Sequence, residues 1–173
     1  MAVHLLGSYA TIEAAWPYMI KQGYGRIVNT TSVSGLYGNF GQANYSTAKA
    51  GIIGLSQAYA RAGAAHNIAV NTIAPAAGTN MSQSVMSKEM ALSMKAQFNA
   101  PFVVALCSSL ITPVPTGLIF ETGLGWGANT ILRRSHSYDF HLIESISPEH
   151  VLDAWTQSGR LGRDDNSTMS PKL

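Results

Sequence analysis

The chain has 173 residues, 46% of them apolar and 12% charged, and a net charge of +2. Its length allows one domain of ordinary size, and the lack of a basic cluster argues against nucleic-acid binding. The single cysteine, Cys107, excludes a disulfide framework or a thiolate metal site within one chain, which fits a reducing, intracellular setting. We expect no metal site. Because Cys107 lies in an apolar run, we expect its thiol to be buried.

The N-terminal segment predicts neither a signal peptide nor a membrane span. It lacks a basic n-region, and His4, Glu13 and Pro17 interrupt its apolar character. The low charged fraction indicates instead that part of the surface is covered by a partner subunit or by further chain.

Helices and strands alternate along the first half of the chain. Pro17 predicts a kink or an early weakening of the first helix, and Pro75 keeps the second strand from continuing. The predicted elements are an amphipathic helix over residues 2–22, a strand over 26–31, a Gly-rich loop over 35–41, a helix over about 42–66 and a strand over 68–73.

The second half continues the alternation and then loses it. Residues 80–95 are polar and Met-rich, which indicates a mobile lid. Further predictions are a helix over 101–109, a strand over 117–121 and a capped helix over 148–156. With about three strands joined by helical crossovers, the pattern indicates an α/β protein with a doubly wound parallel sheet. We expect a domain over 1–126 and a C-terminal extension over 127–173 with a disordered tail.

Three polar residues indicate a proton-transfer site. Tyr45 and Lys49 stand four residues apart, so both side chains lie on one face of the second helix. A cation beside a phenol stabilises the phenolate form. Ser32 at the end of the first strand would complete the site. Taken singly, each residue has a simpler interpretation: a turn serine, a packed tyrosine and a solvated lysine.

Ser32, Tyr45 and Lys49, followed by Val70-Asn71-Thr72-Ile73-Ala74-Pro75, resemble the short-chain dehydrogenase/reductase family. The stretches GLYGNFGQANYSTAK and NTIAPAAGT are similar to the dehydrogenase domains of peroxisomal multifunctional enzymes. The resemblance covers residues 2 to about 156. It implies a Rossmann-like fold, of which this chain is the C-terminal part, and NAD-dependent oxidation of a (3R)-3-hydroxyacyl-CoA in fatty-acid β-oxidation.

The resemblance also implies roles for particular residues. Tyr45 would be the general base, Ser32 would hold the substrate oxygen, and Lys49 would bind the nicotinamide ribose and favour the phenolate. Pro75 and Thr79 would bound a segment against the nicotinamide carboxamide. The choice between NAD and NADP stays open.

Two departures from the family pattern stand out. No Gly-rich phosphate-binding turn occurs in the first 25 residues, so we expect the chain to begin in mid-domain, with the first strands of the sheet absent. At the position where many members have asparagine, this chain has His4. Its role is either a proton relay or packing between helix and sheet.

The resemblance extends to partners and location. The helices over 2–22 and 42–66 would form a homodimer interface or pair with a related dehydrogenase domain. The C-terminal Pro171-Lys172-Leu173 is similar to the signal that the peroxisomal import receptor binds. We therefore expect a peroxisomal protein, with the cytoplasm as the alternative. The competing hypothesis is a catalytically inactive remnant that keeps the dimerisation helices.

Overall fold

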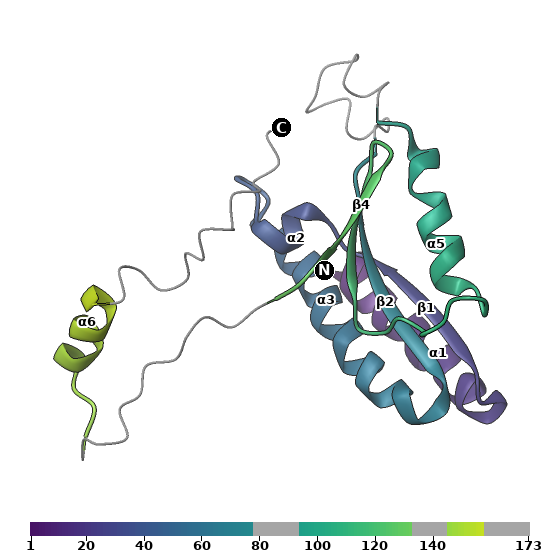
Figure 1. Ribbon diagram of the computed structural model, residues 1–173, viewed down its shortest axis with the longest axis horizontal. Coiled ribbons are helices and arrows are strands. Elements are labelled where there is room, and N and C mark those ends of the chain that lie inside the picture. The colour runs from purple at the N-terminus through teal and green to yellow at the C-terminus, as the bar shows by residue number, and fades with distance from the viewer. Residues whose placement is uncertain (78–93, 133–144, 158–173) are drawn as a thin grey trace. The chain divides into compact units, whose positions relative to one another are not determined.

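The computed structural model describes residues 1–77, 94–132 and 145–157 (Figure 1). The chain divides into two units, Met1–Ile131 and Leu132–Leu173. Among its described residues, the first unit holds one four-stranded sheet in the order β1-β2-β3-β4. The strands are β1 Gly25–Thr30, β2 Ile68–Pro75, β3 Ile119–Gly123 and β4 Trp126–Thr130.

Strands β1, β2 and β3 run parallel, and β4 returns antiparallel to β3. Helices α1 and α3 lie on one face of the sheet and α5 lies on the other (Figure 1). This confirms the predicted α/β fold with a mostly parallel sheet. The helical elements of this unit are η1 Ala2–Leu6, α1 Gly7–Gln22, α2 Val33–Tyr37, α3 Ala43–Gly63, η2 Ala64–His66, η4 Ala96–Phe98 and α5 Ala100–Cys107.

The core lies between β2 and the two helices α1 and α3. Every residue of β2 up to Ala74 is buried, as expected for a strand with neighbours on both sides. Ala60 of α3 packs against Ile68 and Val70, and Trp16 and Met19 of α1 contact the same cluster. This packing places the carboxyl ends of β1 and β2 beside the first turns of α3.

The first helix ends where glycine allows it to end. Gly23 adopts a left-handed conformation with φ 65° and donates its N–H to the carbonyl of Ile20. The early weakening predicted from Pro17 is wrong, because α1 runs on to Gln22. Proline removes one main-chain donor, and here the positions of Pro17 and Glu13 are both exposed, where water can bond the carbonyl left unpaired.

Three further expectations about local structure are wrong. The Gly-rich loop over 35–41 begins inside a helix, α2, because the Ser32 hydroxyl caps it by accepting the N–H of Ser34. The thiol of Cys107 is exposed at the last residue of α5, whose buried residue is the neighbouring Leu106. The helical repeat, rather than the apolar run, decides which side chain faces inward.

The third error is the missed strand β4. The pattern predicts a tail from residue 127, yet Trp126–Thr130 pairs with β3 through a two-residue turn. Both turn residues, Leu124 and Gly125, have positive φ, of 51° and 81°, as in a type I′ hairpin. Leucine rarely adopts this conformation, so the sequence carries only half of the usual hairpin signal.

In the second unit, the described residues form one helix, α6 Pro148–Gln157. Ser147 and His150 cap it reciprocally, because the Ser147 hydroxyl accepts the His150 N–H and His150 Nδ1 accepts the Ser147 N–H. The predicted capped helix is confirmed. Across the described part of the chain, no helix combines the length and hydropathy needed to cross a bilayer.

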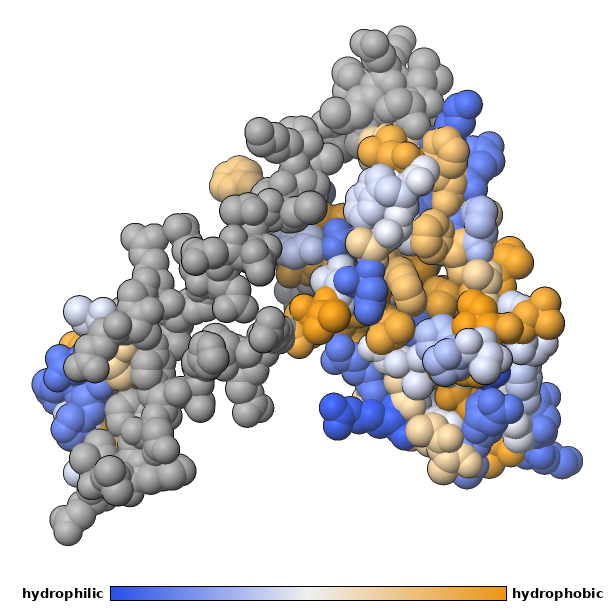
Figure 2. Space-filling model, in the orientation of Figure 1, coloured by the Kyte–Doolittle hydropathy of each residue, from blue (hydrophilic) through white to orange (hydrophobic). Residues whose placement is uncertain are grey.

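The surface of the first unit mixes polar and apolar side chains, as Figure 2 shows for one face. Large apolar residues are well exposed, among them Val3, Phe40 and Leu110. Whether other protein covers these side chains stays a prediction from the low charged fraction of the sequence.

Candidate functional site

The end of β1 is fastened to the second turn of α3. The N–H of Thr31 donates to the carbonyl of Ile73 at 2.7 Å, which continues the pairing of β1 with β2. The buried Thr31 hydroxyl donates to the main-chain carbonyl of Lys49 at 2.6 Å. One buried threonine therefore links the strand that precedes Ser32 to the helix that carries Tyr45 and Lys49.

Lys49 is a buried cation, with 7% of its surface exposed. Its Nζ donates to the carbonyl of Thr30 at 2.8 Å and lies 5.8 Å from the centroid of the Tyr45 ring. Burial lowers the pKa of Lys49, because desolvation disfavours the ammonium form. No carboxylate of the described residues pairs with Lys49, so two of its three N–H donors have no described partner.

Tyr45 lies at the start of α3, half-buried between Lys49 and the first turn of the chain. The ring of His4 packs edge-on against it, with the ring centroids 5.5 Å apart and an interplanar angle of 87°. The two roles left open for His4, a proton relay and packing between helix and sheet, both stay predictions. The histidine is exposed, and no hydrogen bond joins its ring to the other candidate residues in the described structure.

Ser32 stands at the end of β1, as predicted, but its hydroxyl is used locally. Ser32 Oγ accepts the N–H of Ser34 at 3.2 Å and so caps α2. It forms no hydrogen bond with Tyr45 among the described contacts. The structure therefore brings Tyr45 and Lys49 together on one helical face. It places Ser32 at the adjoining end of β1, where the Ser32 hydroxyl oxygen caps α2.

Helix α2 packs closely on α3. A Cβ built on Gly35 would lie 2.8 Å from the main-chain carbon of Lys49, so only glycine allows this approach. At the far end of α2, the hydroxyl of Tyr37 donates to Glu121 Oε1 at 2.6 Å, and Thr130 donates to the same oxygen at 2.5 Å. Burial, and then the hydrogen bond to Glu121, raises the pKa of Tyr37.

Tyr37 and Glu121 are not among the site residues predicted from the sequence. Glu121 is buried, with 8% exposed, although it lies in a predicted strand. A carboxylate inside a strand that is otherwise apolar was the available signal, since buried carboxylates need hydrogen-bond donors. Together the two side chains fasten the end of α2 to β3 and β4.

The segment after β2 is fixed in a similar way. The N–H of Ala76 donates to the carbonyl of Thr122 at 2.6 Å, and Asn99 Nδ2 donates to the carbonyl of Ala76 at 3.2 Å. Asn99 Oδ1 accepts the Thr122 hydroxyl at 2.5 Å. Pro75 is the last residue of β2 and is half-buried. Thr79 and most of the predicted lid over 80–95 lie outside the described residues.

These elements meet at the carboxyl ends of parallel strands, where α/β proteins bind ligands. The free N–H donors of Lys49 and the half-buried Tyr45 hydroxyl suit a ligand rich in hydroxyl and amide groups. The described residues contain no cluster of histidine, cysteine or carboxylate side chains that could hold a metal ion.

Comparison with known proteins gives matches over most of the chain. Residues 1–90 match the family model described as short chain dehydrogenase. The chain is 49% identical over 155 residues to the peroxisomal hydratase-dehydrogenase-epimerase of Neurospora crassa. This alignment covers 90% of this chain and 17% of that protein. It is 42% identical over 161 residues to the peroxisomal multifunctional enzyme type 2 of Mus musculus. That alignment covers 88% of this chain and 21% of that protein.

Two solved structures match the fold. Full-length peroxisomal multifunctional enzyme type 2 from Drosophila melanogaster aligns with a TM-score of 0.78 and 37% identity, over 90% of this chain and 28% of that one. A short chain dehydrogenase from Mycobacterium avium aligns with a TM-score of 0.75 and 32% identity, over 94% of this chain and 56% of that one. The chain thus spans less than two thirds of the length of each of these relatives.

Proposed function

Because this chain belongs to the short chain dehydrogenase family, we propose that it carries the proton-transfer site of an NAD-dependent (3R)-3-hydroxyacyl-CoA dehydrogenase of peroxisomal β-oxidation. The observation that carries the proposal is the buried ammonium of Lys49, 5.8 Å from the centroid of the Tyr45 ring, at the carboxyl ends of β1 and β2. The names of the relatives, which are peroxisomal proteins with a dehydrogenase among them, support the dehydrogenase reaction and the location, while the substrate class rests on the family resemblance.

In this proposal Tyr45 takes the proton of the substrate hydroxyl. The positive charge of Lys49 stabilises the phenolate that must form first. Ser32 donates its O–H to the substrate oxygen, and it can do so while its Oγ still accepts the main-chain N–H of Ser34, because a hydroxyl has both a donor and acceptor lone pairs. A positioned proton-transfer group contributes about 10²–10⁴-fold to the rate.

The described residues fit the nicotinamide half of a dinucleotide. Lys49 has donors to spare for ribose hydroxyls, and hydrogen bonds with Asn99 and Thr122 hold the main chain of Ala76. When bound, NAD supplies the acceptor for the hydride that leaves the substrate carbon. We propose NAD over NADP on the basis of the family resemblance alone, and Thr79 as a further contact.

The test compares Tyr45→Phe with Tyr18→Phe. Tyr18 is a matched control, since it lies on the outer face of α1 with 74% of its surface exposed. With millimolar NAD and a (3R)-3-hydroxyacyl-CoA, we expect the parent chain and the control to reduce the cofactor. Tyr45→Phe should lower the rate by about 10²–10⁴-fold. Equal rates in the two variants would contradict the role of Tyr45.

A second candidate is a non-catalytic subunit that keeps only the assembly surface. It is favoured by the exposed apolar residues Leu6, Tyr9 and Ile20 of the first helical segment. In that case the parent chain gives no turnover with either enantiomer of the substrate, while sedimentation shows a dimer. The dimer, whether with a second copy or a related dehydrogenase domain, stays a proposal.

A further inference from the structure

Helix α2 is too short to hold its own direction. It has five residues, little more than one turn, and isolated helices of this length are not stable in water. Contacts with the rest of the fold must therefore orient it. The hydroxyl oxygen of Ser32 caps the first turn, and the proposed function assigns the O–H of the same group to the substrate oxygen. The direction of α2 therefore sets where the Ser32 hydroxyl points.

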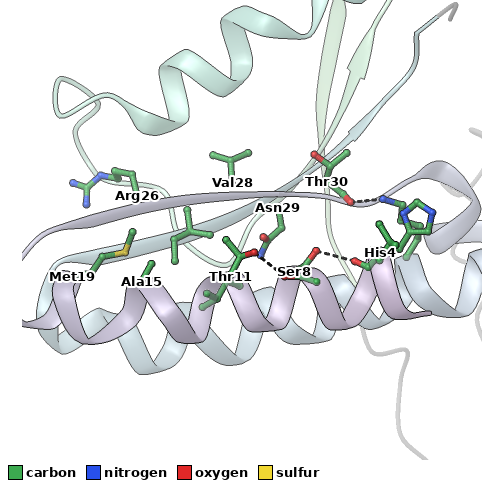
Figure 3. Close-up of a pocket in the computed structure, with 14 residues that line it drawn as sticks. His4, Ser8, Thr11, Ala15, Met19, Arg26, Val28, Asn29 and Thr30 are labelled. Carbon is green, nitrogen blue, oxygen red and sulfur yellow. Dashed lines mark hydrogen bonds between the residues drawn. The ribbon is translucent and has the colours of Figure 1, made fainter.

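The near end of α2 is fixed through β1 and α3. Lys49 Nζ donates to the carbonyl of Thr30, on the edge of β1 that pairs with no described strand (Figure 3). Gly35 packs against the main chain of Lys49. The Ser34 hydroxyl donates to Gln42 Oε1 at 3.1 Å, just before α3 begins. These contacts engage the first three residues of α2 and the strand that precedes it.

A hydrogen bond to a buried carboxylate fixes the far end of α2. The hydroxyl of Tyr37, the last residue of the helix, donates to Glu121 Oε1 at 2.6 Å, and Thr130 donates to the same oxygen at 2.5 Å. Glu121 is 8% exposed, whereas Tyr37 is 57% exposed. The hydrogen bond, and not burial of the ring alone, therefore fixes where Tyr37 lies. Bonds to an ionised acceptor are about twice as strong as bonds between neutral groups.

We propose that Tyr37 and Glu121 are positioning residues for the dehydrogenase reaction, because their hydrogen bond holds α2 in the direction that presents the Ser32 hydroxyl to the substrate oxygen. Both act through Ser32 and not by contact with the substrate. Their role in the reaction rests on the proposed function. Their hold on α2 and on the Ser32 cap is a property of the fold, which can be measured without turnover.

The two hydroxyl donors on one oxygen give a matched pair of variants. Tyr37→Phe and Thr130→Val each remove one hydrogen bond from Glu121 Oε1, so each weakens the surroundings of the carboxylate in a similar way. Only Tyr37→Phe cuts the link to α2, because Thr130 belongs to β4. If the carboxylate had a merely structural role, the two variants would behave alike.

Amide hydrogen exchange, measured residue by residue on the whole chain, follows α2 without turnover. Three main-chain N–H groups report on the helix and its cap. That of Ser34 bonds Ser32 Oγ, and those of Leu36 and Gly38 bond the carbonyls of Ser32 and Ser34. Faster exchange at Ser34 therefore means a looser Ser32 hydroxyl, and faster exchange at the other two means a looser helix.

Tyr37→Phe should speed exchange at these three amides by about tenfold, as expected for the loss of one hydrogen bond to a carboxylate. In Thr130→Val they should exchange as in the parent. The N–H of Thr31, which pairs with the carbonyl of Ile73 in β2, is the internal reference and should not change in either variant. Unchanged exchange in Tyr37→Phe, or equal acceleration in both variants, would overturn the proposal.

The part played by Glu121 is tested in a second background. Glu121→Gln keeps an oxygen that can accept the Tyr37 hydroxyl and removes the charge. Half the bond energy corresponds to the square root of the fold-change, so adding Tyr37→Phe to Glu121→Gln should speed exchange at Ser34 by about threefold instead of tenfold. A full tenfold in this background would show that Tyr37 acts without the carboxylate, and would overturn the pairing.

Turnover with millimolar NAD and a (3R)-3-hydroxyacyl-CoA gives the readout for the reaction. Tyr37→Phe should lower kcat by about tenfold and leave the KM for NAD unchanged, because a displaced Ser32 weakens the contact with the reacting oxygen only. Thr130→Val should keep the parent kcat, as should Tyr18→Phe, which removes a phenol hydroxyl from a residue that is 74% exposed.

The kinetic outcomes separate this proposal from the proposed function. A parent kcat in Tyr37→Phe, together with faster exchange in α2, would show that α2 does not position Ser32 and would overturn the role in the reaction. A parent chain without turnover would refute the proposed function and this role with it. The exchange rates would then still decide whether Tyr37 and Glu121 hold α2 and the Ser32 cap.

Discussion

Gly35 lies where α2 meets α3, and a methyl group has no room there. A Cβ added at Gly35 would lie 2.8 Å from the main-chain carbon of Lys49 and 2.9 Å from the main-chain nitrogen of Ala50. Ordinary carbon contacts are about 3.5–4.0 Å, so α2 must move outward by roughly 0.7 Å or more. Overpacking of this kind costs about 1–3 kcal/mol. The higher helix propensity of alanine offsets up to about 1 kcal/mol of it.

We therefore expect Gly35→Ala to lower the free energy of unfolding by about 1–2 kcal/mol. Gly54→Ala is the matched control, because Gly54 lies inside α3 and nothing stands within 4 Å of its added Cβ. This variant should be more stable than the parent by about 0.5–1 kcal/mol. Urea unfolding followed by circular dichroism at equal protein concentration measures both values.

The sign of each variant's change in the free energy of unfolding tests whether α2 packs on α3 as described. If Gly35→Ala is as stable as the parent or more stable, α2 does not pack on α3 as described. If Gly54→Ala is destabilised in a monomeric sample, the open face of α3 is covered within one chain.

Burial and the bond to Glu13 raise the pKa of Tyr59 from 10.0 to about 12. The stabilisation that the protonated Tyr59 hydroxyl gives the folded chain is fully present below pH 10 and is lost as the pH rises through 12. In urea unfolding, the parent should therefore be more stable than Tyr59→Phe below pH 10, and this difference should shrink between pH 10 and 12. Calorimetry of residues 1–173 alone should show no saturable binding at micromolar NAD, because these residues include no Gly-rich phosphate-binding turn; saturation there would refute this. A fluorescent reporter that carries residues 158–173 should enter peroxisomes, whereas a diffuse cytosolic signal would remove Pro171-Lys172-Leu173 as an address.

Local patterns in the sequence determined much of the fold. The spacing of apolar residues predicted α1 as far as its last residue, Gln22, and β-branched runs predicted the first two strands. The four-residue step from Tyr45 to Lys49 placed both on one helical face, because the helical repeat depends on neither partner nor packing. The site was predictable from sequence to the extent that it is built on a single helix.

Tertiary contacts decided the rest. The positions of Tyr37, Glu121 and Asn99 at the site depend on which strands become neighbours, and no local pattern encodes this. Strand β4 was missed because a hairpin with leucine at positive φ is stable only when β3 offers it a pairing edge.

The same holds for the hydrogen bonds of the site. The sequence by itself determined that Lys49 stands one turn from Tyr45, and thus what chemistry the pair can perform. Only the folded sheet decided that Lys49 is buried and bonds the carbonyl of Thr30 at the open edge of β1. A main-chain acceptor becomes available to a side chain when no strand pairs with it, and strand pairing is a property of the assembled sheet.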